Sequence, residues 1–201
     1  MRFVLFLSST RVGSSFTGVG SWGDRVGSVI KARAEKAGHE VSVWDPKVLN
    51  FPMLQQPIQM LPDKSTIPQW MMDCKKELEE ADAFLTCCAE YNSQIPPALT
   101  NMLDHFPPAS FRHRPVGITT YSVSSGGGMR VQAPLKVMVT DLGMLTVPAS
   151  VKVDFVNKKF DEQGVCTDAK MEEYVDRMIS ETAWYAQAIK NHKTSCGLPS
   201  A

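Results

Sequence analysis

The chain has 201 residues, of which 43% are hydrophobic and 21% charged, and its formal net charge at neutral pH is zero. This length and composition are typical of one globular domain rather than of a disordered chain. The lack of a basic excess argues against a nucleic-acid partner, and the lack of an acidic excess argues against a one-electron carrier that docks on basic proteins.

Strand-like and helix-like segments alternate in the first half of the chain. Apolar runs predict strands, and apolar residues at helical spacing predict helices. In chain order these are strand Phe3–Leu7, a helix from Val26 that Gly38 ends, strand Glu40–Asp45, helix Trp70–Glu80, strand Asp82–Cys88 and helix Pro96–Phe106. Two long loops are expected, from Ser8 to Gly23 and from Leu49 to Pro68.

The second half continues the alternation. It predicts strand Pro115–Tyr121, a helix from Val131 to Leu142, a short strand Leu145–Val147 and a long final helix whose apolar stripe runs from Met171 to Ile189. Residues 1–193 are therefore expected to form a single domain, and residues 194–201 a C-terminal tail.

Five strands that alternate with helices predict an α/β fold, a three-layer sandwich in which a five-stranded parallel sheet carries helices on both faces. Right-handed crossovers leave few windings, and the strand order 2-1-3-4-5 is the natural choice. In such sheets ligands bind at the carboxyl ends of the strands, near the point where the winding reverses. The loops after the first, third and fourth strands are therefore the candidate site.

The first of these loops begins Ser8-Ser9-Thr10-Arg11 and ends Gly23-Asp24-Arg25. Hydroxyls, backbone N–H groups and a helix start together favour an anion, and Arg11 and Arg25 are suited to pair with phosphate oxygens. The alternative is an ordinary loop whose Ser and Gly residues only serve turns.

The second loop is Ala89-Glu90-Tyr91-Asn92, directly after a buried strand. An aromatic side chain and backbone amides there suit a flat ring. The alternative is a turn in which Asn92 caps the following helix.

The third loop runs from Tyr121 through Ser124 and Gly126-Gly127-Gly128 to Arg130. Three consecutive glycines let a ligand approach the backbone closely. Their N–H groups lie at a predicted helix start and favour negative charge at the edge of a bound ring.

These three loops, in this order, resemble the NADPH-dependent FMN reductase family of flavodoxin-like quinone, azo and FMN reductases. The resemblance covers Met1 to about Pro148, with four departures from the family pattern: Ser8 for Gly, Ala89 for Pro, Thr100 for Lys, and a longer stretch between Arg11 and Arg25. The matching segments are Ser8-Ser9-Thr10-Arg11, Ala89-Glu90-Tyr91-Asn92, Gln94-Ile95-Pro96, Leu99-Thr100-Asn101-Met102-Leu103-Asp104 and Ser124-Ser125-Gly126-Gly127-Gly128-Met129-Arg130.

The resemblance implies a flavodoxin-like fold that binds FMN. By motif, Ser9 and Arg11 would bind the FMN phosphate, with Arg25 as a third partner. The other flavin-binding residues implied are Glu90, Tyr91 and Asn92 along the isoalloxazine, and Ser124, Gly126 and Gly127 at its pyrimidine edge.

The resemblance also implies a ping-pong oxidoreductase. NADPH or NADH gives hydride to flavin N5 and leaves before a quinone, azo compound, free flavin or similar small acceptor enters. No catalytic side chain is expected, since the flavin supplies the reactive atom. A homodimer or homotetramer is implied as well. One alternative is a non-catalytic FMN-binding protein that serves in electron transfer or as a redox sensor. A third possibility is a scaffold protein that has lost FMN.

The cysteines and apolar runs bear on location. The five cysteines are odd in number and match no disulfide framework, which favours the reducing cytoplasm. Alternation along a strand would place the Cys87 and Cys88 sulfurs on opposite faces, as buried small hydrophobes. No apolar run approaches the roughly 18 residues of a membrane span, and no His or Cys spacing predicts a metal site.

Overall fold

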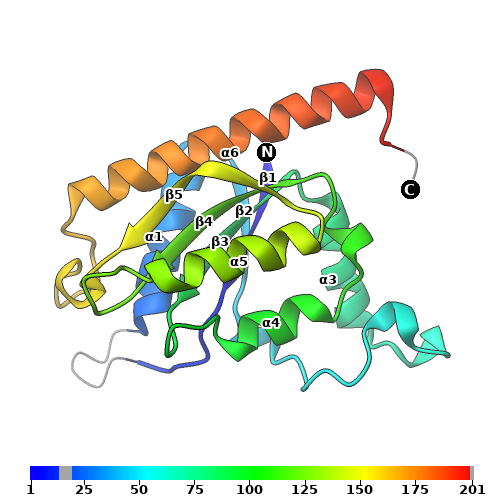
Figure 1. The fold of residues 1–201 in the computed structure, drawn as a ribbon, viewed down its shortest axis with the longest axis horizontal. Coiled ribbons are helices and arrows are strands. Elements are labelled where there is room, and N and C mark those ends of the chain that lie inside the picture. Colours follow the sequence, from blue (N-terminus) through cyan, green and yellow to red (C-terminus); the bar gives the residue numbers. More distant parts are fainter. Residues whose placement is uncertain (14–19, 200–201) are drawn as a thin grey trace.

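Five parallel strands in the order β2-β1-β3-β4-β5 form the centre of the computed structural model, which describes residues 1–13 and 20–199 (Figure 1). The order and direction of the strands confirm the α/β prediction, and the winding reverses between β1 and β3. The strands are β1 (Arg2–Leu7), β2 (Glu40–Trp44), β3 (Ala83–Ala89), β4 (Pro115–Tyr121) and β5 (Leu145–Val153).

Helices cover both faces of this sheet (Figure 1). One face carries α1 (Trp22–Lys36) and α6 (Ala169–Cys196). The other carries α3 (Gln69–Glu80), α4 (Pro97–Asp104) and α5 (Met129–Asp141), with the short α2 (Pro46–Leu49) beside α4. No helix among the described residues is long and apolar enough to cross a membrane.

The sheet separates two apolar cores, which explains the continuous apolar runs in its strands. In β1, Val4 and Phe6 face the core under α3, α4 and α5, whereas Phe3, Leu5 and Leu7 face the core under α1 and α6. The same alternation places the two adjacent cysteines of β3 in different cores, as expected. Both are buried free thiols.

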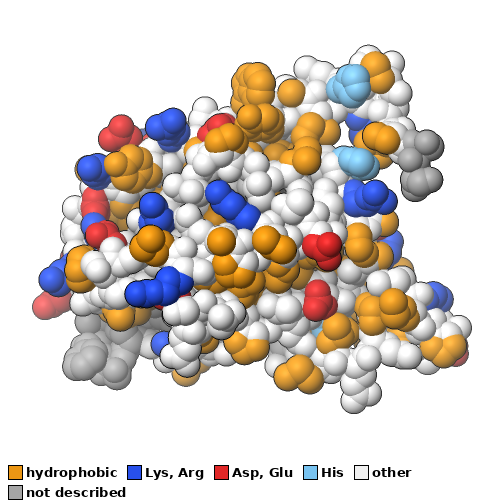
Figure 2. All heavy atoms as spheres, viewed as in Figure 1, with side chains coloured by type: hydrophobic (Ala, Val, Ile, Leu, Met, Phe, Trp, Pro, Cys, Tyr) orange, Lys and Arg blue, Asp and Glu red, His pale blue; other side chains and the backbone are white. Residues whose placement is uncertain are grey.

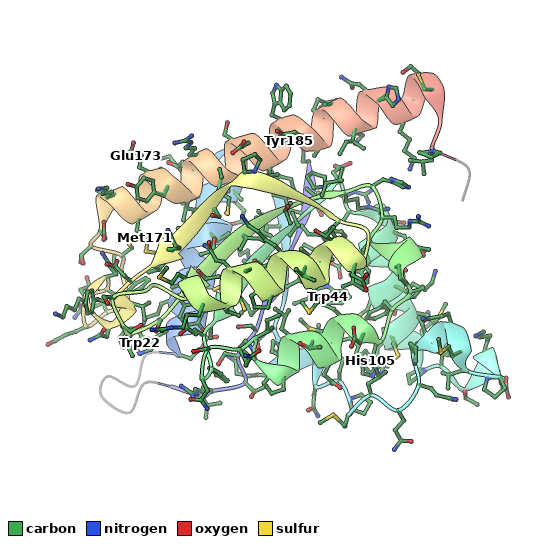
Figure 3. All side chains as sticks on the ribbon, viewed as in Figure 1. Trp22, Trp44, His105, Met171, Glu173 and Tyr185 are labelled. Atoms are coloured by element: carbon green, nitrogen blue, oxygen red, sulfur yellow. The ribbon has the colours of Figure 1, made fainter. Side chains whose placement is uncertain are left out.

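Trp44 joins the end of β2 to the first of these cores (Figure 3). Its ring meets the Phe6 ring edge-on at 5.6 Å between centroids, and its indole N–H donates to Glu77 at 2.7 Å. Large aromatic contacts of this kind fix β2 against α3 and α4.

Several boundaries differ from the predictions. α1 begins at Trp22, one turn before the predicted Val26. β5 continues to Val153 instead of ending at Val147, because the strand bulges around Pro148. Val116 pairs with Thr146 and Ile118 with Ser150, and an edge strand tolerates a proline at such a bulge. Near the C-terminus, α6 continues to Cys196, so residues 194–196, predicted as part of the tail, are helical.

Candidate functional site

The first and second loops meet at the carboxyl end of β1 and β3. The Ser8 hydroxyl accepts a hydrogen bond from the Ala89 backbone N–H at 2.8 Å. One residue further along, the hydroxyls of Ser9 and Tyr91 lie 2.5 Å apart. The structure thus brings a predicted phosphate ligand and a predicted ring contact into direct contact, although 82 positions separate them in sequence.

Arg11 completes this cluster. Its guanidinium lies over the Tyr91 ring, 4.0 Å from the centroid, and its backbone N–H donates to the Ser9 hydroxyl at 3.1 Å. A cation, a hydroxyl and an aromatic face therefore converge at one point of the sheet edge. The middle of the first loop, residues 14–19, lies outside the described residues.

Side chains at the start of α1 cap its first backbone N–H groups. Ser21 and Asp24 form a capping box, in which each side chain accepts from the backbone N–H of the other. Asp24 also pairs with Lys47. Burial alone raises the pKa of Asp24, but hydrogen bonds from Lys47 and Ser21 outweigh it and hold the pKa below its ordinary value. This acidic cap was not foreseen from the sequence, although Ser-x-x-Asp before a helix is its usual signal.

Arg25 is buried in the same first turn of α1, and one of its contacts is with the segment after β5. Its guanidinium lies 4.6 Å from the centroid of the Trp22 ring and 3.5 Å from the Asp161 carbonyl oxygen. Its role as a third phosphate partner stays a prediction.

The second loop reverses through a two-residue turn. Tyr91 and Gln94 exchange two backbone hydrogen bonds of 3.1 and 2.9 Å, and Asn92 and Ser93 between them have φ of +50° and +66°. These values are typical of the mirror-image hairpin turn. The expectation that Asn92 caps the next helix is wrong, because its backbone is left-handed and α4 begins only at Pro97.

Glu90 links the second loop to the third. Its side chain is 7% exposed, and it accepts from the Arg130 guanidinium at 3.0 Å and from the Arg130 backbone N–H at 3.4 Å. The Glu90 N–H donates to the Tyr121 carbonyl oxygen at 3.3 Å. A carboxylate at the first turn of α5 also matches the helix dipole.

The third loop packs tightly against the strands below it. Gly127 and Gly128 have φ of +56° and +77°. A Cβ on Gly127 would lie 2.9 Å from the Asp154 backbone nitrogen, and one on Gly128 would lie 2.8 Å from Thr120 Cβ. Only glycine fits these two positions without strain.

The outer part of the same loop is open. Ser124 is exposed, and its hydroxyl lies 3.0 Å from that of Ser122. The backbone N–H groups of Ser125 and Gly126 have no hydrogen-bond partner within the part of the chain that the structure describes. They are available to donate to a carbonyl or anionic edge of a ligand.

This set of donors fits FMN. The Ser9 hydroxyl and the Arg11 cation suit a phosphate, and Tyr91 offers an aromatic contact. Across the edge, the N–H groups of Ser125 and Gly126 suit the oxygen-bearing pyrimidine edge of an isoalloxazine. The predicted residues of the three loops thus gather along one edge of the sheet.

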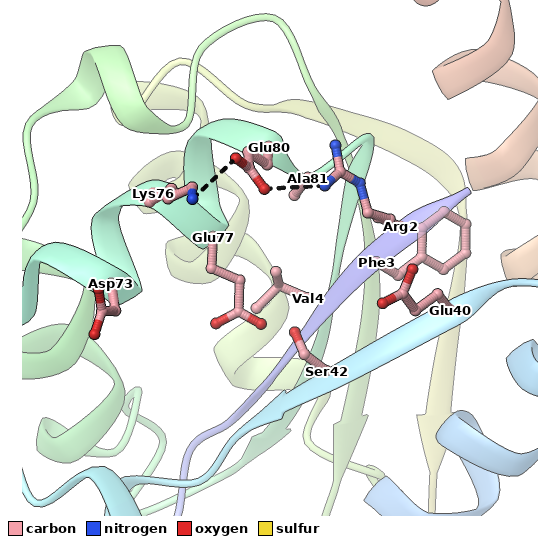
Figure 4. Close-up of a pocket in the computed structure, with 10 residues that line it drawn as sticks. All are labelled: Arg2, Phe3, Val4, Glu40, Ser42, Asp73, Lys76, Glu77, Glu80 and Ala81. Carbon is pink, nitrogen blue, oxygen red and sulfur yellow. Dashed lines mark hydrogen bonds and ion pairs between the residues drawn. The ribbon is translucent and has the colours of Figure 1, made fainter. Parts of the chain in front are cut away.

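A hollow of about 350 Å³ lies at the opposite edge of the sheet, beside the amino ends of β1 and β2 (Figure 4). Two of its acidic side chains, Glu77 and Glu80, already serve the fold. Glu80 pairs with Arg2 and Lys76, and Glu77 accepts from the indole of Trp44. This hollow is separate from the candidate site, because the three loops lie at the far ends of the strands.

Solved structures of flavin proteins share the fold. The flavoenzyme NAD(P)H:(acceptor) oxidoreductase FerB from Paracoccus denitrificans is 19% identical, with a TM-score of 0.72 over 92% of this chain and 98% of that chain. RosB, solved with 8-demethyl-8-formylriboflavin-5'-phosphate, is 12% identical, with a TM-score of 0.69 over 98% and 82%. The apo form of the NADH:FMN oxidoreductase EMOB is 12% identical, with a TM-score of 0.63 over 93% and 89%.

The sequence itself gives the family. The model of the family described as NADPH-dependent FMN reductase matches residues 1–158, which include all three loops of the candidate site. The chain therefore belongs to the NADPH-dependent FMN reductase family, and it is an oxidoreductase with FMN as cofactor and a reduced nicotinamide nucleotide as co-substrate.

Proposed function

We propose that this oxidoreductase takes hydride from NADPH or NADH and passes the electrons to quinones, azo compounds, free flavin or similar small acceptors by a ping-pong mechanism. The observation that carries the proposal is the meeting of three ligand-binding loops at one sheet edge, with Ser9, Arg11 and Tyr91 in mutual contact. In the part of these loops that the structure describes, there are donors for a flavin and no nucleophile placed beside a base.

The residue assignments are part of this proposal. Ser9 and Arg11, with Arg25, bind the FMN phosphate. Tyr91, Glu90 and Asn92 line the ring, and the Glu90–Arg130 ion pair holds the second loop against the start of α5. The remaining assigned residues are Ser124, Gly126 and Gly127, at the pyrimidine edge.

The reaction order follows from the space available. The GxGxxG run of the sequence, Gly18-Val19-Gly20-Ser21-Trp22-Gly23, falls inside the first loop, which is assigned to the FMN phosphate, and the sequence holds no second one, so one flavin face would serve both the nucleotide and the acceptor in turn. Bound FMN supplies the hydride-accepting chemistry. The protein's part is to hold the ring, to place N–H donors at its electron-rich edge and to leave one face open.

The cellular setting is proposed with the function. Reduced cysteines and a soluble nucleotide substrate favour the cytoplasm, and a homodimer or homotetramer is the proposed assembly. Small molecules, not nucleic acid or membrane, are the proposed partners.

The test is a visible absorption spectrum of the FMN-loaded protein, repeated after anaerobic addition of NADPH and then of a quinone. Rapid bleaching by NADPH and rapid recovery with the quinone, together with parallel lines in double-reciprocal plots, support the proposal. A flavin spectrum that persists with NADPH would point to an electron-transfer or sensor protein instead. Failure to retain any flavin after incubation with FMN would overturn the site assignment.

A further inference from the structure

A lysine outside the three loops lies at the start of α1. Lys47 belongs to α2, which follows the carboxyl end of β2, and its ammonium pairs with Asp24 and, at 3.3 Å, with Asp45. The Lys47 side chain is only 19% exposed, and both carboxylates are half-buried. Water and salt screen such a pair less than they screen a pair on the surface, so its charges act on their neighbours.

The start of α1 lies beside the proposed phosphate ligand Ser9. A Cβ added at Gly23, the residue before Asp24, would lie 2.6 Å from the Tyr121 hydroxyl. Burial raises the pKa of Tyr121, and a hydrogen bond with the Ser9 side chain opposes that shift. The first turn of α1 and the phosphate ligand therefore lie against the same tyrosine hydroxyl.

The cap of α1 is an unfavourable neighbour for a phosphate. The Asp24 carboxylate accepts from the Ser21 backbone N–H at 2.8 Å, and its pKa lies below the ordinary value, so it is ionised at neutral pH. A negative charge close to a phosphate dianion lowers the affinity for the phosphate. A neutral side chain such as Asn or Ser would cap the helix without this repulsion. The carboxylate is therefore compatible with a phosphate only where a cation offsets its charge.

The remainder of the surface does not supply that offset. The formal net charge of the chain is zero, and Figure 2 shows acidic and basic side chains scattered over the face in view, without a large area of one charge. A field from the whole molecule is therefore weak, and the balance is local. The Lys47 ammonium, in direct contact with the Asp24 carboxylate, provides it.

We propose that Lys47 is a positioning residue for the FMN phosphate, which holds the capping carboxylate of Asp24 and cancels its charge so that the phosphate binds beside the cap. This inference rests on the proposed assignment of the phosphate to Ser9 and Arg11, and it adds a residue that none of the three loops contains. Lys47 thereby sets the preference of the site for FMN over riboflavin, which has the same ring system and no phosphate.

The test is titration of the flavin-free full-length protein with FMN and, in parallel, with riboflavin, followed by flavin fluorescence. Lys47→Met removes the cation and keeps an unbranched side chain. It should weaken FMN binding about tenfold and leave the affinity for riboflavin unchanged, since only FMN carries the phosphate.

Two further variants separate charge from structure. Asp24→Asn removes the carboxylate, keeps a side chain that caps a helix, and should tighten FMN binding. The double variant Asp24→Asn/Lys47→Met has the same net charge at the cap as the wild type and should return to wild-type affinity for FMN. A merely structural role for the pair predicts the opposite sign for Asp24→Asn and equal losses for both flavins.

Lys75→Met is the matched control, because Lys75 forms a similarly half-buried pair with Glu79 in α3, and it should change neither affinity. Lys47→Arg keeps the charge and should retain the preference for FMN. If Lys47→Met does not fold, the sign of the Asp24→Asn effect and the Lys47→Arg result decide the question.

Three results would each overturn the inference: an equal loss of FMN and riboflavin affinity in Lys47→Met, weaker FMN binding in Asp24→Asn, or a double variant that binds FMN no better than Lys47→Met. If the wild type binds FMN and riboflavin equally well, the phosphate assignment in the proposed function fails, and this inference fails with it. If the wild type prefers FMN and Lys47→Met keeps that preference, this inference alone fails.

Discussion

Replacing Gly127 with alanine should destabilise the protein through the third loop of the site. The residue has φ of +56°, where an alanine is strained, and its Cβ would lie 2.9 Å from the Asp154 nitrogen and 3.1 Å from the carbonyl carbons of Lys152 and Val153. All three neighbours are backbone atoms of β5 or of the residue that follows it. They cannot turn aside as a side chain does.

Two terms set the size of the effect. The left-handed conformation costs about 1–2 kcal/mol for a residue with a Cβ, and overpacking against backbone costs about 1–3 kcal/mol. The free energy of unfolding of Gly127→Ala should therefore fall by about 2–4 kcal/mol, allowing for partial relaxation. The affinity for FMN should fall as well, because the same shift moves the Ser125 and Gly126 donors.

Urea unfolding of the FMN-free protein, followed by circular dichroism, measures the first effect without any contribution from the ligand. Quenching of flavin fluorescence on titration measures the second. Gly126→Ala is the matched control, since its φ is not positive and the nearest neighbour of its Cβ would be the flexible Met129 side chain, at 3.4 Å. The reasoning is refuted if Gly127→Ala unfolds at the same urea concentration as Gly126→Ala.

Three further predictions concern single side chains. Arg11→Ala should weaken FMN binding about ten- to hundredfold through loss of a charged phosphate contact, and unchanged affinity in a fluorescence titration would remove Arg11 from the phosphate site. The pKa of Asp24 is lowered in the folded state and that of Lys47 is raised. The stability from Asp24 is thus present above its unfolded pKa and lost as pH falls through the lower folded pKa. The contribution of Lys47 is full below its unfolded pKa and is lost as pH rises through the folded value. The unfolding free energies of wild type and Asp24→Asn should therefore converge below about pH 4, and a constant difference down to pH 2 would contradict this. Finally, exposed Cys196 should react first with a thiol reagent at pH 8, whereas burial raises the pKa of Cys88 to about 12 and protects it. Cys196→Ser should abolish the fast phase, and a fast phase that survives would show another thiol to be accessible.

The sheet could be predicted from the sequence because both of its faces are buried. Strands β1, β3 and β4 are almost completely buried and contain few charged or strongly polar residues, so their existence and carboxyl ends follow from the sequence, and right-handed crossovers then give their order. Those ends place the three loops, and the loop compositions place the candidate ligands. The contact between Ser9 and Tyr91 follows from the fold once β1 and β3 are known to be neighbours.

The features missed depend on contacts that composition does not encode. β5 is an edge strand of the sheet and its burial pattern is irregular. In the sequence, Pro148 indicates the end of a strand, whereas in the structure the strand continues past it through a bulge. The left-handed turn at Asn92, closed by the backbone hydrogen bonds between Tyr91 and Gln94, cannot be distinguished from a helix cap by composition, because Asn suits both. The ion pair between Lys47 and Asp24 joins two elements whose contact only the tertiary structure shows.

The conformations of the three site loops are fixed largely by contacts between the loops and with neighbouring elements. The Ser8 hydroxyl accepts a hydrogen bond from the Ala89 N–H. Gly23 leaves room for Tyr121, because a Cβ added at Gly23 would lie 2.6 Å from the Tyr121 hydroxyl. The Glu90 carboxylate then ties the second loop to α5. Since each loop is held by the next, a ligand that orders one of them limits the motion of the others. Binding at the phosphate end should for this reason also fix the N–H donors at the ring end, which is the form of pre-organisation that a flavin enzyme requires.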